Sequence, residues 1–179
     1  ADAAGAGMST SAHTPVMLAE VVAALAPKPG GIYVDGTFGG GGWSRAILAA
    51  GECTVWGLDR DAAAIKAGET LKRDSGGRLK LVQSRFGALR EALAAEGVEA
   101  VDGVAFDLGL SSDQLASGER GFSFSTDGPL DMRMEQRGRS AAELVNDAPE
   151  EELTHILAAY GEEPKARRVA RAIVTARKI

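Results

Sequence analysis

The fold is decided by the stretch Ile32-Tyr33-Val34-Asp35-Gly36-Thr37-Phe38-Gly39-Gly40-Gly41-Gly42, in which a short apolar run ends in a carboxylate and leads into a glycine loop. A second apolar run, Val55-Trp56-Gly57-Leu58-Asp59, also ends in an acid. Short apolar runs bounded by turn residues are typical of buried strands. A strand, a glycine loop, a helix and a second strand form the nucleotide-binding half of an open α/β sheet. The stretch therefore predicts an α/β fold with a nucleotide-like cofactor beside the loop.

Strand and helix patterns alternate along residues 16–107. The expected strands are 32–35, 54–59, 79–83 and 103–107, and the expected helices are 16–26, 43–50, 61–74 and 87–96. Thr14 and Pro15 suit the N-cap and the first position of the first helix. Strands that alternate with helices at this spacing form parallel sheets with crossover helices. We therefore expect a partial Rossmann-like sheet of about four parallel strands.

The pattern changes after Ser112. Residues 113–139 carry turn formers and paired charges without a regular period, which predicts a long functional loop. Ser140 and Glu143 have the spacing of a capping box, and Pro149 and Pro164 suit the first positions of two further helices. The expected parts are a disordered leader or expression remnant at 1–12, a cofactor-binding domain at 13–112, and a loop with helices at 113–179. Because no fifth strand follows and the last helix runs to the final residue, we expect the chain to be part of a longer protein.

Composition restricts the kinds of site that the chain can hold. The single cysteine, Cys53, excludes an internal disulfide and a cysteine-rich zinc site, and the two histidines, His13 and His155, leave little for metal ligation. No run approaches the roughly 18 apolar residues that span a bilayer, and no signal sequence opens the chain. These features favour a cytosolic protein without a metal or a membrane partner.

Basic residues gather near the end of a chain whose formal net charge is −5. Residues 165–178 contain six basic residues and no acidic one, and helical spacing brings Arg167, Arg168 and Arg171 near one another. Such a helix face is often simply solvated. The alternative is a contact with RNA phosphates.

The glycine loop suits two classes of cofactor. Gly39 to Gly42 lack Cβ atoms, so backbone can approach a ligand closely, and the following helix offers free N–H donors. A dinucleotide enzyme prefers G-x-G-x-x-G spacing, but Ser44 stands where the third glycine would be. An S-adenosylmethionine enzyme typically has an acid at the end of the first strand, as Asp35 is here, and that carboxylate would repel a pyrophosphate. A glycine-rich turn without a ligand is the remaining alternative.

Two residues near the next two strands suit the rest of a nucleoside. Asp59 follows the loop by about twenty residues, where a carboxylate accepts hydrogen bonds from both ribose hydroxyls. It would alternatively cap the helix that starts near Asp61. Arg60 would suit a 2′-phosphate, which leaves NADP open. Phe86 follows the third strand and is expected either to pack on an adenine ring or to belong to the core.

Asp107 comes at the expected carboxyl end of the fourth strand, where open α/β sheets bind their ligands. Methyl transfer to an exocyclic amine depends mainly on alignment of the amine and exclusion of water. A carboxylate at this place would accept an N–H bond from the amine and orient its lone pair. Alternatively, Asp107 only orders the loop 108–112. Gln114 is near enough in sequence to line the same pocket.

The chain closely resembles the bacterial 16S ribosomal RNA cytosine-N4-methyltransferases of the MraW type over about residues 13–179. The motifs that carry the resemblance are His13-Thr14-Pro15-Val16-Met17-Leu18, Asp35-Gly36-Thr37-Phe38-Gly39-Gly40-Gly41-Gly42, Leu58-Asp59-Arg60-Asp61, Phe106-Asp107-Leu108-Gly109-Leu110-Ser111-Ser112-Asp113-Gln114-Leu115, Arg120-Gly121-Phe122-Ser123-Phe124, Asp127-Gly128-Pro129-Leu130-Asp131-Met132-Arg133-Met134 and Tyr160-Gly161-Glu162-Glu163. The stretch 127–134 is the specific one, whereas the glycine loop alone is not.

This resemblance implies a Rossmann-like, S-adenosylmethionine-dependent enzyme that methylates N4 of a cytidine in the decoding region of 16S rRNA. It implies the following site residues: Gly41, Gly42 and position 43 contact the cofactor, Asp59 binds its ribose, and Phe86, Asp107 and Gln114 complete the pocket. Trp43 replaces a histidine common in the family. A contact through the backbone would survive this change, and a contact through a ring nitrogen would not.

The resemblance also implies that residues 113–179 are part of an inserted helical domain that engages the substrate RNA within the small ribosomal subunit. A cytidine must be single-stranded or flipped out before its N4 atom is accessible. We expect Phe122 and Phe124 to stack on bases and Arg167, Arg168 and Arg171 to contact phosphates. Two alternatives remain: an NAD(P)-dependent oxidoreductase, and an RNA-binding fragment without catalysis.

Overall fold

The computed structural model describes residues 15–177, except for the side chain of Asp113. The expected leader at 1–12, His13 and the expected N-cap Thr14 lie outside the described residues. The chain divides into two compact units, one ending at Gly109 and the other beginning at Leu110. Each unit is described by itself.

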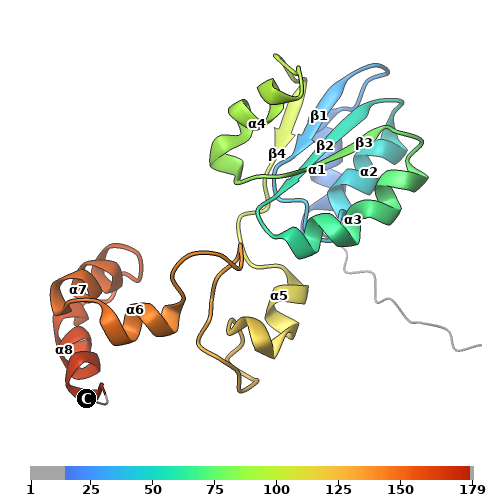
Figure 1. The fold of residues 1–179 in the computed structure, drawn as a ribbon. Helices are drawn as coiled ribbons and strands as arrows, with labels where there is room; N and C mark the ends of the chain where they lie inside the picture. Colours follow the sequence, from blue (N-terminus) through green and yellow to red (C-terminus); the bar gives the residue numbers. More distant parts are fainter. Residues whose placement is uncertain (1–14, 178–179) are drawn as a thin grey trace, which may run out of the picture. The chain divides into compact units, whose positions relative to one another are not determined.

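The first unit is built on a sheet of four parallel strands (Figure 1). The strands are β1 (Ile32–Asp35), β2 (Thr54–Asp59), β3 (Leu79–Gln83) and β4 (Gly103–Ala105), in the order β3-β2-β1-β4. The predicted α/β fold with a parallel sheet is confirmed. β4 ends two residues before the predicted boundary at Asp107, because its neighbour β1 turns into the glycine loop after Asp35, which pairs with Ala105.

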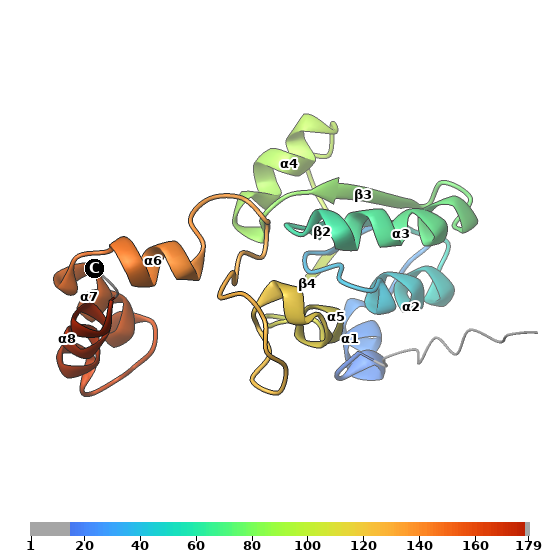
Figure 2. The ribbon, with the colours of Figure 1, turned by 60° about the horizontal axis from the view of Figure 1, so that its bottom comes forward.

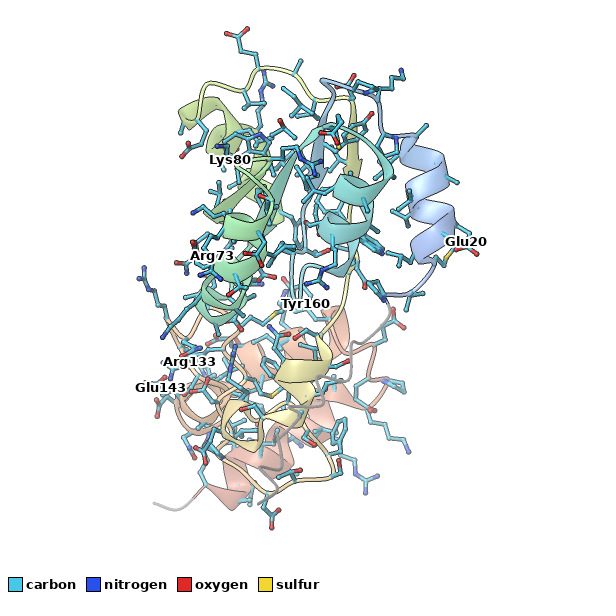
Figure 3. The ribbon with its side chains drawn as sticks, turned by 90° about the vertical axis from the view of Figure 1, so that its right-hand side faces the viewer. Glu20, Arg73, Lys80, Arg133, Glu143 and Tyr160 are labelled. Atoms are coloured by element: carbon cyan, nitrogen blue, oxygen red, sulfur yellow. The ribbon has the colours of Figure 1, made fainter. Side chains whose placement is uncertain are left out.

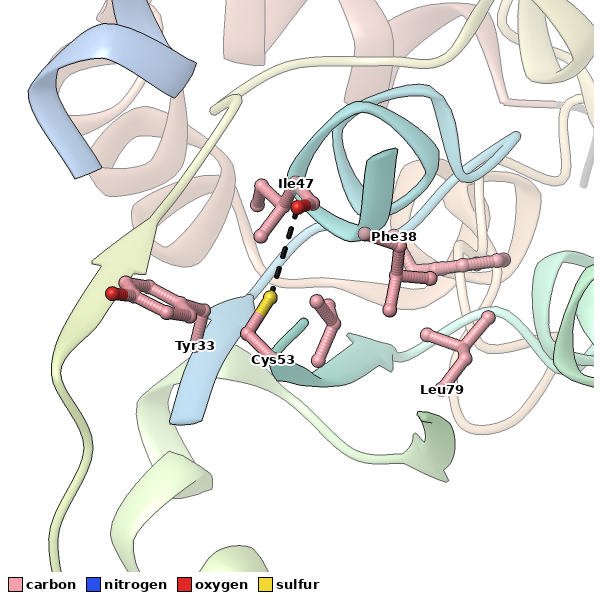
Figure 4. Packing of buried hydrophobic residues seen from close by; sticks show 7 residues of the cluster. Tyr33, Phe38, Ile47, Cys53 and Leu79 are labelled. Atoms are coloured by element: carbon pink, nitrogen blue, oxygen red, sulfur yellow. Dashed lines mark hydrogen bonds between the residues drawn. The ribbon is translucent and has the colours of Figure 1, made fainter. Parts of the chain in front are cut away.

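Helices cover both faces of this sheet. Figure 2 shows α4 (Leu89–Ala95) on one side and the other helices of the unit, α1 (Leu18–Leu25), α2 (Gly42–Ala50) and α3 (Ala62–Asp74), on the opposite side. Side chains alternate accordingly along β1, since Tyr33 joins the cluster that packs with Ile47 of α2, whereas Val34 joins the cluster that packs with Leu93 of α4. Figure 4 shows the first cluster, in which the thiol of Cys53 lies 3.7 Å from the carbonyl oxygen of Ile47.

Two predicted helix boundaries are wrong. The first helix begins at Leu18 rather than Val16, because Met17 has a left-handed backbone with φ of 52°. The predicted helix 87–96 is a 3-10 turn, Phe86–Ala88, followed by α4. Among the residues that the structure describes, no helix is long and apolar enough to cross a membrane.

Phe38 anchors the glycine loop to the sheet. Its side chain is 3% exposed, and its N–H donates to the carbonyl oxygen of Leu58 at 2.8 Å. Three glycines make room for the ring: a Cβ at Gly41, Gly57 or Gly68 would lie only 2.7, 2.6 or 2.5 Å from it. The loop thus begins from a point fixed in the core.

A buried carboxylate joins β1 to α2. Asp35 is 1% exposed, and its Oδ2 accepts hydrogen bonds from the hydroxyl of Ser44 at 2.8 Å and from its N–H at 3.2 Å. The N–H of Thr37 donates to Oδ1 at 3.4 Å. Burial raises the pKa of Asp35 to about 6, although these bonds act in the opposite direction. The charge at the end of β1 is therefore held inside the fold, beneath the loop.

The second unit is helical. It contains α5 (Ser112–Ala116), a 3-10 turn at Gly118–Arg120, α6 (Ala141–Asp147), α7 (Glu150–Ala159) and α8 (Ala166–Ala176). The last three share a small apolar core of Ala148, Leu153 and Ala170, with Leu144, Leu157, Ile173 and Val174 packed around it. The predicted capping box at Ser140 and Glu143 is confirmed, and its hydrogen bonds lower the pKa of Glu143.

The prediction that residues 113–139 form only a loop is wrong at their start, where α5 lies. The side chains of Ser111 and Gln114 explain this helix, because each accepts a hydrogen bond from the other's N–H, at 3.2 and 3.0 Å. Further along the segment, Arg133 bonds both carboxylate oxygens of Asp131 and holds the pKa of that acid at about 2. Figure 3 shows Arg133 near Glu143 of α6. The loop is thus ordered by its own ion pair.

The buried Asp35 leads to a prediction about pH. Its pKa of about 6 in the folded protein lies above its ordinary value of 3.8, so the folded state binds this proton more tightly. The stability that this proton confers is present at low pH and is lost as the pH rises through 6. Between pH 4 and pH 7.5, we expect Asp35 to lower the free energy of unfolding by about 2 to 3 kcal/mol.

Urea unfolding of the native chain and of Asp35→Asn at several pH values measures this contribution. The difference in unfolding free energy between the two proteins should change with pH across this window, with an inflection near 6. Asp74→Asn, at the exposed end of α3, is the matched control and should run parallel to the native chain. Parallel curves for Asp35→Asn would refute the assignment.

Candidate functional site

Residues predicted to bind a ligand lie along one edge of the first sheet. Asp35 and Asp59 end β1 and β2, and Phe86 and Asp107 follow β3 and β4 by a few residues. Because the strands are parallel, their carboxyl ends meet at the same edge. The order of the strands reverses between β1 and β4, which is where open α/β sheets bind ligands. The topology therefore gathers these positions at a binding crevice.

The glycine loop presents backbone donors at this edge. Gly39 and Gly41 have φ of 49° and 72°, in the left-handed region that favours glycine. Gly41 is the N-cap of α2, so the N–H groups of Gly42 and Trp43 open the helix and have no carbonyl one turn earlier to bond. Such N–H groups, together with the positive end of the helix dipole, suit a carboxylate or another anion.

Two of the predicted cofactor residues turn their side chains inward. Trp43 is 8% exposed, and its indole N–H donates to the carbonyl oxygen of Val16 at 3.4 Å. Asp35 has its oxygens occupied by Ser44 and Thr37, as described above. Trp43 therefore has its backbone left for a ligand, and Asp35 acts on the site through the position of the loop.

Asp59 is bonded to the glycine loop. Its Oδ2 accepts a hydrogen bond from the N–H of Gly39 at 2.8 Å, and its Oδ1 accepts one from the N–H of Asp61 at 2.8 Å. The alternative that Asp59 caps the next helix is wrong, because the N-cap of α3 is Asp61, which accepts from the N–H of Ala63 at 3.0 Å. The half-buried carboxylate of Asp59 therefore stands between the loop and the end of β2.

Phe86 and Asp107 face outward at the other strands. Phe86 is 46% exposed, so the alternative that it belongs to the core is wrong. Its ring lies 5.7 Å from that of Phe106 in an edge-to-face arrangement. The N–H of Asp107 donates to the hydroxyl of Thr37 at 2.7 Å, and its side chain is exposed. Asp107 is thus fixed by its backbone while its carboxylate remains open to a substrate.

Thr37 and Phe38 are the residues of this edge that sequence reasoning did not single out. Both stand inside the quoted glycine stretch, but their roles depend on residues far along the chain. The partner of Thr37 is Asp107, 70 residues later, and Phe38 lies against Gly57 and Gly68. The only sequence signal was that two bulky or branched residues interrupt a run of glycines.

The remaining predicted residues belong to the second unit. Gln114 is 8% exposed and takes part in the start of α5. Phe124 is fully exposed, whereas the ring of Phe122 is half-buried and lies 5.9 Å from the guanidinium of Arg120.

Three arginines lie exposed on α8. They are Arg167, Arg168 and Arg171. Arg171 is within 3.5 Å of a carboxylate oxygen of Glu150, at the start of α7. Arg167 and Arg168 are therefore the stronger candidates for a contact with phosphate.

Metal ligands were searched for in the same coordinates. Within residues 15–177, no three His, Cys, Asp or Glu side chains are grouped as ligands of a metal ion would be.

Known proteins resemble the chain over almost all of its length. Ribosomal RNA small subunit methyltransferase H of Paramagnetospirillum magneticum is 56% identical over 96% of the chain and 54% of its own length. The protein of the same name from Granulibacter bethesdensis is 53% identical over 97% of the chain and 52% of its own length. The chain thus spans about half the length of these curated relatives. An rRNA methylase structure from Streptococcus thermophilus is 19% identical, with a TM-score of 0.37, over 43% of this chain and 46% of that one.

The family comparison covers more than nine tenths of the sequence. Residues 10–179 match the MraW methylase family. The match includes the glycine loop, both strand-end acids and the whole second unit. The chain belongs to the MraW methylase family.

Proposed function

We propose that the protein of this chain is an S-adenosylmethionine-dependent methyltransferase that modifies the exocyclic N4 amine of a cytidine in the decoding region of 16S rRNA. The observation that carries this proposal is the hydrogen bond between Asp59 and Gly39, which joins a ribose-binding acid and a glycine loop into one site. Family membership and the names of the relatives support the rRNA substrate. Such a substrate, within the small ribosomal subunit, implies a cytoplasmic enzyme.

The described residues fit each part of the cofactor. The N–H groups of Gly42 and Trp43 suit the carboxylate of its methionine part, because a helix N-terminus favours an anion. The carboxylate of Asp59 suits the ribose hydroxyls, and the exposed ring of Phe86 suits the adenine. When bound there, the cofactor would supply an electrophilic methyl group on a sulfonium.

Asp107 is the residue that we assign to the chemistry. Its backbone is tied to Thr37, so its carboxylate has a defined place beside the loop that holds the cofactor. A carboxylate there accepts an N–H bond from the cytidine amine and directs the lone pair of that nitrogen. This alignment is the main contribution that a protein makes to such a displacement.

An NAD(P)-dependent oxidoreductase fits the site less well. Ser44 stands where a third glycine would be, and its hydroxyl is buried and bonded to Asp35. Asp59 would repel a 2′-phosphate. No observation on the described residues favours this alternative.

We assign substrate binding to the second unit. The exposed ring of Phe124, with Phe122 beside it in sequence, suits stacking on unpaired bases, and Arg167 and Arg168 suit phosphates. Arg171 is more than half exposed, so its ion pair with Glu150 is weak enough to exchange for a phosphate. Gln114 completes the cofactor pocket in this proposal.

The first prediction concerns the cofactor. Calorimetric titration should detect binding of S-adenosylhomocysteine and none of NADP. Asp59→Asn should weaken the binding about ten- to a hundredfold, because a carboxylate accepts bonds from both ribose hydroxyls and an amide does not. Asp74→Asn removes a charge from an exposed site on α3 and should leave the affinity unchanged. Tighter binding of NADP than of S-adenosylhomocysteine would contradict the proposal.

The second prediction concerns catalysis. In the full-length protein, Asp107→Asn should keep its affinity for S-adenosylhomocysteine within about twofold, because the backbone bond to Thr37 remains. Methyl transfer to small ribosomal subunits should fall at least about a hundredfold, the usual contribution of a group that assists proton transfer. Mass spectrometry of nucleosides from the digested rRNA measures N4-methylcytidine. Glu99→Gln, an exposed site before β4 at the opposite edge of the sheet, is the control, and full turnover by Asp107→Asn would remove its assigned role.

The third prediction concerns RNA. Reversing two charges in Arg167→Glu/Arg168→Glu should weaken binding to a 16S rRNA fragment and reduce the salt slope, log K against log salt, by about 1 to 2. Lys72→Glu/Arg73→Glu makes the same change of charge on α3 and serves as the control. Filter binding at several salt concentrations measures both slopes. Equal slopes for the two double variants would show that α8 does not contact the RNA.

A further inference from the structure

Phe106 is an exposed aromatic residue to which nothing above assigns a role. It follows β4 directly, precedes Asp107, and keeps 42% of its surface exposed. A phenylalanine at the surface usually carries no meaning by itself. Here, however, two independent contacts hold the ring in place at the carboxyl edge of the sheet.

The first contact is with the start of the glycine loop. A Cβ at Gly36 would lie 2.2 Å from Cε1 and 2.5 Å from Cδ1 of Phe106, so the ring rests directly on the backbone of Gly36. The N–H of Gly36 donates to the carbonyl oxygen of Ala105 at 2.9 Å, which fixes the two segments side by side. The absence of a side chain at position 36 is therefore what allows the ring of Phe106 to lie there.

The second contact is with Phe86. The centroids of the two rings are 5.7 Å apart and their planes are inclined by 64°. Phe86 follows β3 and Phe106 follows β4, which lie at opposite ends of the strand order, about 14 Å apart at the usual spacing of strands. The rings meet because the segment after β3 turns back across the sheet edge. Edge-to-face contact of this kind restricts the orientation of both rings.

We propose that Phe106 is a positioning residue of the cofactor site: seated on Gly36, its ring holds the ring of Phe86 in the orientation in which Phe86 packs against the purine of the cofactor. This inference rests on the proposed function, in which Phe86 contacts adenine. It adds a residue that would act on affinity for the base through Phe86 and not by its own bond to the ligand. Phe106 would thereby link the order of the glycine loop to recognition of the base.

A double-mutant cycle tests this role. Affinity for S-adenosylhomocysteine is measured by calorimetry for the unchanged chain, Phe86→Ala, Phe106→Ala and the double variant. We expect Phe106→Ala alone to weaken binding about three- to tenfold, the range of an aromatic pair. If Phe106 acts through Phe86, its removal should have no further effect once Phe86 is gone. Multiplying losses would contradict the positioning role.

Three further measurements separate positioning from general disruption. Phe106→Tyr keeps the aromatic edge and should restore the affinity, whereas Phe106→Leu keeps apolar bulk and should bind as weakly as Phe106→Ala. S-ribosylhomocysteine lacks the adenine, so Phe106→Ala should leave its affinity unchanged in a competition experiment. Tyr160→Ala removes an exposed aromatic from α7's end and is the control. Full affinity in Phe106→Leu, or equal losses for both ligands, would overturn the proposal.

The outcomes also separate this inference from the proposed function. If the unchanged chain binds no S-adenosylhomocysteine, the cofactor assignment fails and the role of Phe106 fails with it. If the unchanged chain binds it and the two phenylalanine substitutions act independently, only the positioning role is wrong. The urea midpoint of each variant shows that it is folded, and Phe106→Tyr and Phe106→Leu decide the matter if Phe106→Ala is not.

Discussion

The carboxylate of Asp59 bonds two backbone N–H groups, those of Gly39 and Asp61, and the cofactor edge depends on this arrangement. One bond fixes the glycine loop, and the other fixes the turn into α3. Without Asp59, a loop of four glycines would be free to take many conformations, because glycine is the least restricted residue. With it, the donors at the start of α2 have a defined direction. The same carboxylate is the group that we propose for the ribose, so order in the loop and binding of the ligand depend on one side chain.

The two strand-end acids serve different purposes although the sequence presents them alike. Asp35 is buried and is bonded to Ser44, which ties β1 to α2 and raises its pKa. Asp59 is half-buried and lies against the loop at the edge of the sheet. Burial makes the first acid a part of the scaffold, whereas partial exposure leaves the second one accessible. The difference is set by one strand position in the sheet: β1 is central, and its end is covered by the loop that follows it.

Much of the fold could be predicted from the sequence, because its strands are short apolar runs that end in recognisable turns. β1, β2 and β3 have the predicted bounds, and the capping box at Ser140 was visible as a spacing. The Ser111 and Gln114 pair was equally visible, but it stands inside a familiar motif and was read for its chemistry alone. The start of α1 could not be predicted, because the left-handed backbone of Met17 has no signal in a methionine.

The candidate site was predicted at its positions but not in its contacts. Strand ends mark where ligands bind, so Asp59, Phe86 and Asp107 could be singled out without coordinates. The inward turn of Trp43 could not, because it depends on a carbonyl group of Val16 in another segment. Nor could the meeting of Phe86 with Phe106, which requires knowing how the chain returns across the sheet. Contacts between distant segments are the part that pattern cannot supply.

The glycine sockets around Phe38 have a consequence for anyone who redesigns this protein. Gly68 lies in the middle of α3, where helix propensity alone would recommend alanine, and Gly57 lies in a strand, where it would recommend a branched residue. Both replacements would collide with the ring that anchors the loop. A stabilisation campaign guided by local preference would therefore damage the cofactor edge from two positions that never touch a ligand. The tolerance of a site to engineering is decided here by residues that no catalytic motif contains.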